Sequence, residues 1–242
     1  MARALSKLGY CSRSDAFELI SAGRVSLNGG VCRNPEAPVR SGLDRIEVDG
    51  VPLGAPAKVY LMLNKPRGVV TTASDEKGRE TVYAYLDGAL PWVAPAGRLD
   101  KASEGLLLLT NDSEWAAHLL APGTHLHRIY HVQISAVADA GLIESITKGV
   151  RTGDGNILRA RSAQILRGGK KNTWLEIVLD QGKNRHIRRM LTQLGINVLR
   201  LLRVAMGPLR LGELAKGASR RLTDAEKQAL DRAMRLPSAL EG

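Results

Sequence analysis

The sequence has few aromatic residues, few cysteines and no long apolar run. Phe, Trp and Tyr make up 4% of the 242 residues, with a single Phe, so a surface that grips single strands through a row of stacked bases is excluded. Two cysteines, Cys11 and Cys32, exclude a disulfide framework and lack the paired spacing of a zinc site. No apolar segment is long enough to span a bilayer, and MARALSKLGYCSRSDA lacks the apolar region of a signal peptide. We therefore expect a cytoplasmic protein without membrane attachment.

Acidic residues are also scarce relative to basic ones. The 35 Lys and Arg against 24 Asp and Glu give a formal net charge of +11, and the pI is near 10.0. Such a balance favours an extended polyanion as partner, with nucleic acid ahead of an anionic membrane surface. The length and the 44% hydrophobic content suit one medium domain with a small appendage.

Residues 1–55 have the pattern of a small helical and stranded domain. Ser12 is a candidate N-cap for a helix over residues 13–22, and a shorter helix is expected over residues 2–8. Asn28-Gly29 and Asp49-Gly50 are hairpin turn signals that follow short apolar segments. The segment VPLGAPAK contains two prolines and a glycine, and we place a linker at residues 56–60 within and after it.

The N-terminal segment LSKLGYCSRSDAFELISAGRVSLNGGVCRNPEAPVRSGLDRIEVDG resembles the S4 RNA-binding domain over nearly all of residues 2–50. Scattered basic residues alone fit phosphate contact and an ordinary solvated surface about equally. Because the S4 family lays its helix pair on structured RNA, the resemblance implies RNA binding here. The candidate phosphate contacts in this domain are Arg3, Lys7, Arg13 and Arg24.

The apolar segment VYLMLN opens a second domain, which we place at residues 61–230, with a tail at 231–242. Interleaved strand and helix patterns predict an α+β domain around a mixed sheet. Beyond VYLMLN, strand patterns occur at residues 68–72, 106–110, 129–134 and 174–179, and helical patterns at 114–120, 138–148, 184–194 and 224–234.

In GRLDKASEGLLLLTND, Asp100 lies in a loop just before an apolar strand. A loop on a rigid scaffold holds a side chain firmly and leaves it open to a substrate, as a catalytic carboxylate requires. Aspartate in such a loop is more often a turn or capping residue. The segment alone leaves both roles open.

In RIYHV, strand alternation places Arg128 and Tyr130 on one face and Ile129 and His131 on the other. A buried Tyr offers a ring for stacking and a hydroxyl for hydrogen bonding or proton transfer. A tyrosine that only packs in the core is the alternative.

GKNRHIRRMLTQLG has the pattern of an amphipathic helix with an arginine cluster on its polar side. Guanidinium groups bind phosphates, or hold a nearby carboxylate ionised. A solvated polar face is the alternative, above all for Arg189. The apolar stripe is Ile187, Met190, Leu191 and Leu194, and the arginines are Arg185, Arg188 and Arg189.

Taken in order, these three segments resemble the three motifs of the ribosomal RNA pseudouridine synthases that carry an S4 domain, and NKPRGVV resembles the start of their catalytic domain. The resemblance covers about residues 2–225. It implies an α+β fold: a small S4 domain with a helix pair and short strands, then a catalytic domain with a mixed, mainly antiparallel sheet flanked by helices. It also implies isomerisation of a specific uridine to pseudouridine in rRNA, either free or in a ribosome assembly intermediate. GKNRHIRRM and Arg128 favour 23S over 16S rRNA.

The resemblance also implies the roles of individual residues. Asp100 acts on the ribose, either by attacking C1′ or by removing the 2′ proton, and Tyr130 stacks on the uracil. Arg188, with Arg185 as the rival, pairs with Asp100 and keeps it ionised. No cofactor or metal is expected; His125, His127 and His131 have poor ligand spacing. The candidate RNA contacts of this domain are Lys65, Arg67, Arg79, Arg98, Arg128 and Arg189.

The chain departs from the family pattern at two places. Many members have Lys two positions before the tyrosine, where this chain has Arg128, and Asp-Thr where this chain has Ala102-Ser103. The first change keeps the charge but alters its reach and geometry. The second weakens any role that the resemblance could assign to those two side chains.

Two functions of other classes remain as alternatives. In a noncatalytic rRNA-binding or ribosome-assembly protein, the second domain only braces the RNA. In an RNA hydrolase, Asp100 is a general base; the absence of a second carboxylate in the motif argues against it. We expect a monomer, because the sequence has no heptad repeat and no spare apolar face.

Overall fold

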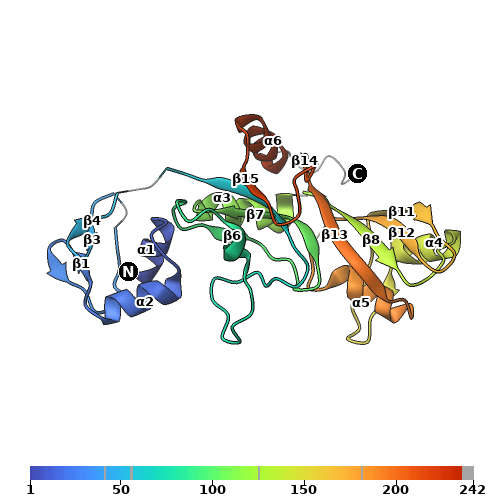
Figure 1. The fold of residues 1–242 in the computed structure, drawn as a ribbon, viewed down its shortest axis with the longest axis horizontal. Helices are drawn as coiled ribbons and strands as arrows, with labels where there is room; N and C mark the ends of the chain where they lie inside the picture. The colour runs from blue at the N-terminus through green and yellow to red at the C-terminus, as the bar shows by residue number, and fades with distance from the viewer. Residues whose placement is uncertain (41, 55–56, 125, 181, 236–242) are drawn as a thin grey trace.

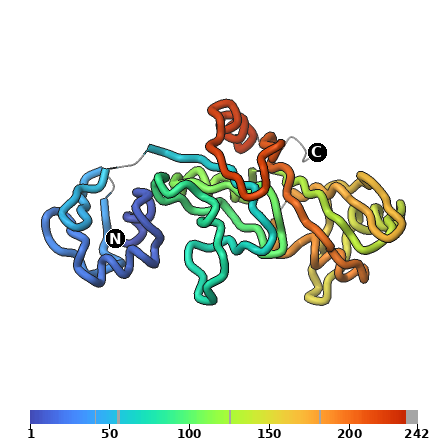
Figure 2. Tube along the Cα trace, viewed as in Figure 1, coloured from blue at the N-terminus to red at the C-terminus, as the bar shows by residue number. Residues whose placement is uncertain are grey.

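A computed structural model describes residues 1–40, 42–54, 57–124, 126–180 and 182–235. None of the helices in these ranges is long and apolar enough to cross a membrane. The chain begins in a small body at one end of an elongated molecule and continues into a larger body built on a single sheet (Figures 1 and 2).

Two helices and a four-stranded antiparallel sheet form the described part of the small body. The Ser12 hydroxyl accepts a hydrogen bond from the Asp15 N–H (3.1 Å) and the Asp15 carboxylate accepts one from the Ser12 N–H (3.3 Å), a capping box that starts the second helix. Asn28 and Gly29 have φ of 53° and 84°, as a two-residue hairpin turn requires. The elements are α1 (Ala2–Lys7), α2 (Arg13–Ser21), β1 (Val25–Leu27), β2 (Gly30–Val31), β3 (Ile46–Val48) and β4 (Val51–Pro52).

The larger body contains, within the described residues, a nine-stranded sheet with the order β11-β12-β8-β13-β7-β5-β15; β14 pairs with β13 and β6 with β7. The pairing of β13 with β7 is parallel and the other pairings are antiparallel. The predicted mixed, mainly antiparallel sheet is therefore confirmed. The strands are β5 (Tyr60–Lys65), β6 (Ala94–Ala96), β7 (Glu104–Thr110), β8 (Arg128–Ile134), β11 (Ser162–Gly168), β12 (Thr173–Leu179), β13 (Val198–Met206), β14 (Leu209–Arg210) and β15 (Ser219–Arg221), with β9 (Val150–Arg151) and β10 (Ile157–Leu158) in a separate ribbon.

Helices cover both faces of this sheet, and β7 shows why its sequence is a continuous apolar run. Leu107 and Leu109 point into one buried cluster, and Leu106 and Leu108 into another. A strand that is buried on both faces has no polar side to alternate. The helices α4 (Ala140–Lys148) and α5 (His186–Gln193) pack on the first cluster, and α3 (Ser113–Leu120) and α6 (Asp224–Arg235) on the second.

Several predicted elements are confirmed and one is wrong. The predicted apolar stripe of the helix that follows Arg185 packs in the core, although α5 begins only at His186, because Arg185 has a φ of 48°. The strand predicted at residues 68–72 does not form; Val70 makes only an isolated bridge to Thr81. The strands β11 and β13 were not predicted. Part of the predicted linker, at residue 56, and the end of the predicted tail, at 236–242, lie outside the described residues.

Candidate active site

The turn that carries Asp100 is held by hydrogen bonds to its backbone. Donors from residues 65–71 and from α5 bind the five successive carbonyls of residues 99–103. Within the described residues, no hydrogen bond or ion pair engages the Asp100 carboxylate, so the turn is fixed and the carboxylate is free. The bonds are Lys65 Nζ to the carbonyls of Asp100 (3.3 Å) and Ser103 (3.0 Å), Thr71 Oγ1 to Leu99 (2.8 Å), the Gly68 N–H to Lys101 (2.7 Å) and Arg188 Nη2 to Ala102 (2.9 Å).

Lys65 was predicted to contact RNA phosphate, and the structure does not fit that role. Its side chain is fully buried, and its ammonium also donates to the Pro66 carbonyl. Burial lowers the pKa of Lys65 to about 8, although the charges of Glu104 and Asp100 oppose this shift. Lys65 is the last residue of β5, and its ammonium is enclosed by carbonyls of the distant Asp100 turn, so its burial depends on tertiary contacts that a local sequence pattern does not reveal.

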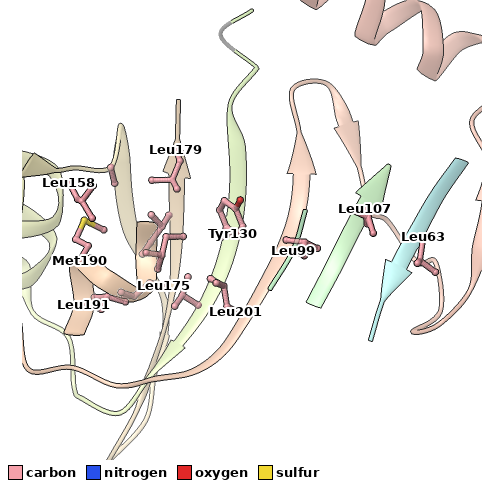
Figure 3. Packing of buried hydrophobic residues seen from close by; sticks show 14 of the residues in the cluster. Leu63, Leu99, Leu107, Tyr130, Leu158, Leu175, Leu179, Met190, Leu191 and Leu201 are labelled. Atoms are coloured by element: carbon pink, nitrogen blue, oxygen red, sulfur yellow. The ribbon is translucent and has the colours of Figure 1, made fainter. Parts of the chain in front are cut away.

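A cleft of about 320 Å³ opens beside this turn. Asp100 and Tyr130 both line it, and Tyr130, 8% exposed, lies between Leu99 and Leu179 in the buried cluster (Figure 3). Arg128, Arg98 and Arg185 line the same cleft. The structure thus brings together side chains from a loop, from strand β8 and from the start of α5 that are far apart in the sequence.

The two candidate partners of Asp100 are placed differently. Arg188 is half-buried, and its guanidinium donates to the carbonyls of Ala102 (2.9 Å) and Val198 (3.4 Å). Desolvation lowers the pKa of Arg188, the Arg185 charge lowers it further, and the Asp100 charge opposes both. In the described part of the chain, no arginine lies within 4.0 Å of the Asp100 carboxylate as an ion pair. The Arg188 side chain therefore binds the backbone of the Asp100 turn and not the Asp100 carboxylate. Arg185 is exposed at the cleft.

Arg203 lines the cleft too, and sequence analysis missed it. It is 4% exposed; its Nε donates to the Leu106 carbonyl (2.7 Å), and its Nη2 is buried with no hydrogen-bond partner among the described residues. Its position pairs with Tyr130 across strands β13 and β8. A signal was available: an arginine within the apolar segment LLRVAM has the alternation of an inward-facing strand residue.

The motif does contain a second carboxylate, contrary to the expectation from sequence: Glu104, four residues after Asp100, is buried, whereas Asp100 is half-buried. Arg200 donates two hydrogen bonds to Glu104 (3.1 and 2.9 Å), and Lys216 lies 3.7 Å away. Burial raises its pKa, but the bonds and charge of Arg200 outweigh burial and leave the pKa lowered. Glu104 is therefore an ion-paired structural anion at the start of β7.

The other predicted RNA contacts lie outside this group. Arg79 forms an ion pair with Asp75 in the loop after Val70, and Arg189 forms one with Asp154. Lys7 lies 3.7 Å from Glu114 of the larger body, and Arg24 pairs with Asp49. The exposed side chains among the predicted contacts are Arg3, Lys7, Arg13, Arg24, Arg67, Arg79 and Arg98.

Metal ligands do not gather in the described ranges: no three His, Cys, Asp or Glu side chains form a group that could hold an ion. His131 is 3.4 Å from Glu176, and His127 is 2.8 Å from Asp180. His125 lies outside the described residues.

Comparison with known proteins agrees with this arrangement. The family model for RNA pseudouridylate synthase matches residues 59–193, and the S4 domain model matches residues 2–44. An RNA pseudouridine synthase of Aquifex aeolicus is 36% identical over 96% of this chain and 93% of its own length. The ribosomal large subunit pseudouridine synthase B of Bacillus subtilis is 34% identical over 94% of this chain and 93% of its own length.

A solved structure agrees as well. The crystal structure of a pseudouridylate synthase superposes with a TM-score of 0.66 at 27% identity, and the match covers 95% of this chain and 98% of that one. Match lengths of this kind span both bodies of the molecule, so the likeness is to whole proteins and not to one module. The chain belongs to the RNA pseudouridine synthase family, as an enzyme with an N-terminal S4 domain and a C-terminal catalytic domain.

Proposed function

We propose that this enzyme isomerises one specific uridine of the large-subunit 23S rRNA, with Asp100 as its catalytic carboxylate. The observation that carries the proposal is the Asp100 turn: hydrogen bonds fix its backbone, and its carboxylate stands unengaged beside a cleft of uracil-compatible size. A preorganised group of this kind reacts without a preceding rearrangement. The large-subunit target is supported by the name of the Bacillus subtilis relative.

The reaction breaks the bond between C1′ and N1, turns the freed uracil and joins C5 to C1′. Asp100 acts on the ribose by one of two routes, attack on C1′ or removal of the 2′ proton. Tyr130, whose ring is buried in the cleft wall, stacks on the base. The target base leaves its stack first, which costs a few kcal/mol and favours loops and bulges. Arg98, exposed beside Asp100, then contacts the flanking backbone.

The same proposal gives the surface charges a role in holding RNA. Arg3 and Arg13 in the S4 domain, and Arg67 in the catalytic domain, are exposed cations that suit phosphate contact. The enzyme acts as a monomer in the cytoplasm, on free rRNA or on an assembly intermediate.

The test is pseudouridine-specific chemical labelling and primer extension on rRNA from cells that lack this protein. Complementation uses wild type, Asp100→Ala and, as a matched control, Asp87→Ala, an exposed carboxylate outside the cleft. We expect one stop in 23S rRNA to disappear without the protein, and wild type and Asp87→Ala to restore it. Restoration by Asp100→Ala would remove Asp100 from the chemistry. An unchanged rRNA pattern would favour a noncatalytic RNA-binding role.

A further inference from the structure

The floor of the cleft contains a buried positive charge that no described carboxylate neutralises. Arg203 and Arg128 both line the cleft, and neither forms an ion pair within 4.0 Å in the described part of the chain. Among the described residues, Arg128 donates only to the backbone carbonyls of Leu126 and Asp180 (both 3.3 Å). Desolvation lowers the pKa of Arg128, Tyr130 opposes that shift, and the Arg203 charge adds to it.

An uncompensated guanidinium in a protein interior is costly. Its presence at the edge of a cleft points to a ligand that supplies the missing anion. Glu104 provides the contrast within the same domain, because its buried charge is neutralised by Arg200 at 2.9 Å. Arg203 uses Nε on the Leu106 carbonyl and leaves Nη2 without a described partner. The buried side of the cleft therefore carries a positive charge that suits an anionic ligand.

The location of Arg203 indicates which part of an RNA substrate it contacts, the phosphate backbone or the base. Arg98, Lys183 and Arg185 are exposed cations on the cleft lining, where a phosphate chain in solvent reaches them. Arg203 is buried instead, opposite Tyr130 in the register of β13 and β8. A base stacked on Tyr130 would therefore lie beside Arg203, away from the exposed cations that suit a phosphate.

We propose that Arg203, assisted by Arg128, stabilises the negative charge that the uracil carries while it is detached from the ribose. This inference rests on the proposed uridine isomerisation. When the bond between C1′ and N1 breaks, its electron pair stays on the uracil and spreads to O2 and O4. C1′ either bonds to an Asp100 oxygen, or the 2′ proton moves to Asp100 and a double bond forms between C1′ and C2′.

The charge leaves the base when C5 attacks C1′ and the electron pair enters the new bond. In the same step the bond from C1′ to Asp100 breaks, or Asp100 returns its proton to C2′, so that the Asp100 carboxylate is regenerated. The C5 proton then passes to water and N1 takes up a proton from water, which gives neutral pseudouridine. A buried cation next to the detached base thus interacts more strongly with the intermediate than with neutral uridine. Interactions of that kind lower the barrier, because only differential stabilisation accelerates a chemical step. Arg203 is accordingly a catalytic residue that acts on the leaving base, whereas Asp100 acts on the sugar.

A leaving-group experiment tests this assignment. Wild type, Arg203→Met and Arg203→Lys react under single-turnover conditions with an rRNA fragment that carries either uridine or 5-fluorouridine at the mapped position. Fluorine at C5 stabilises the uracil anion, so that less depends on the protein. The readout is the rate at which the starting nucleoside is lost, measured by mass spectrometry of nuclease digests. Arg220→Met is the control, since Arg220 lies on β15 outside the cleft and pairs with Glu226 of α6.

We expect Arg203→Met to slow the loss of uridine by about 100-fold, the range seen when one donor to a developing anion is removed. The loss of 5-fluorouridine slows much less, Arg203→Lys recovers most of the rate, and Arg220→Met changes neither. An equal slowing on both bases, or weaker RNA binding at a normal rate, overturns the proposal. If Arg203→Met does not fold, Arg203→Gln takes its place, because its amide donates hydrogen bonds but carries no charge. A ratio of the uridine rate to the 5-fluorouridine rate equal to that of wild type then overturns the proposal. A wild type without turnover on any fragment refutes the proposed function instead.

Discussion

The S4 domain and the catalytic domain place the same types of charged residue in opposite environments. In the S4 domain, Arg24 pairs with Asp49, Arg40 with Asp44 and Arg45 with Glu47, and all three guanidiniums are largely exposed. In the catalytic domain, Lys65, Glu104 and Arg203 are buried. Exposed pairs contribute little to stability and are screened by salt, whereas buried charges act strongly over short distances. In the S4 domain these charges form pairs at the surface, and in the catalytic domain buried charges hold the Asp100 turn and line the cleft.

The largest expected effect on stability comes from neutralising the buried carboxylate of Glu104, compared with the surface carboxylate of Glu47. Glu104→Gln leaves Arg200 and Lys216 without their buried partner, and we expect a loss of about 2–3 kcal/mol in the free energy of unfolding, since both cations keep some contact with water. Glu47→Gln breaks the pair with Arg45, whose guanidinium is largely exposed, and costs less than about 1 kcal/mol. Urea unfolding of the three proteins at pH 7 measures both values.

Repeating the unfolding measurement at acidic pH provides the control. Because the pKa of Glu104 is lowered in the folded protein, its contribution is complete above the ordinary carboxyl pKa and is lost as the pH falls through the lowered value. The gap between wild type and Glu104→Gln therefore narrows below about pH 4. Equal losses in Glu104→Gln and Glu47→Gln would show that burial does not distinguish the two regions.

The next effect is a pH dependence at Lys65. Its pKa is lowered from 10.5 to about 8 by burial, so the folded protein releases this proton before the unfolded chain does. Stability conferred by Lys65 consequently rises with pH between about 8 and 10.5. Relative to Lys65→Met, wild type gains about 2 kcal/mol between pH 7 and pH 10.

Lys58→Met is the matched control for this shift, because Lys58 is largely exposed beside Asp112. Denaturant unfolding at four pH values between 7 and 10 gives the two curves, and the Lys58→Met curve should run parallel to wild type. A flat difference for Lys65→Met as well would mean that the ammonium is not desolvated. Turnover should also fall in Lys65→Met, because two carbonyls of the Asp100 turn lose their donor.

Sequence predicted the parts of the fold that depend on local patterns. The capping residue Ser12, the Asn28-Gly29 turn and the apolar stripe of α5 follow from short-range chemistry. Strand β13 was missed because its charged residues interrupt the apolar pattern, although it is central to the sheet. Its close parallel approach to β7 depends on Gly105, where a Cβ would lie 2.3 Å from the Arg203 carbonyl oxygen.

Within the site, the sequence motifs identified side chains by type but not by environment. Loop position and strand alternation made Asp100 and Tyr130 candidates, the family resemblance implied their roles, and both side chains line the cleft. Whether a lysine or an arginine is exposed depends on what packs over it from elsewhere in the chain. For this reason Lys65 was assigned to RNA and Arg203 was overlooked, although their side chains are buried near the same turn.

The smallest effect, on RNA affinity, distinguishes free from paired cations within the S4 domain itself. Arg13 is exposed and forms no ion pair within 4.0 Å among the described residues, whereas the Arg24 guanidinium donates to both oxygens of Asp49 (2.9 and 2.5 Å). Arg13→Ala should weaken binding of the rRNA fragment by about 3- to 10-fold and reduce the salt dependence by about one counterion.

The matched double variant Arg24→Ala with Asp49→Ala removes a neutral pair and should change affinity less than about twofold. Filter binding between 50 and 200 mM salt, roughly the range over which phosphate contacts are most visible, measures both. A larger loss in the double variant would mean that RNA displaces Asp49 from Arg24, and that pairing in the free protein does not exclude a cation from the RNA interface.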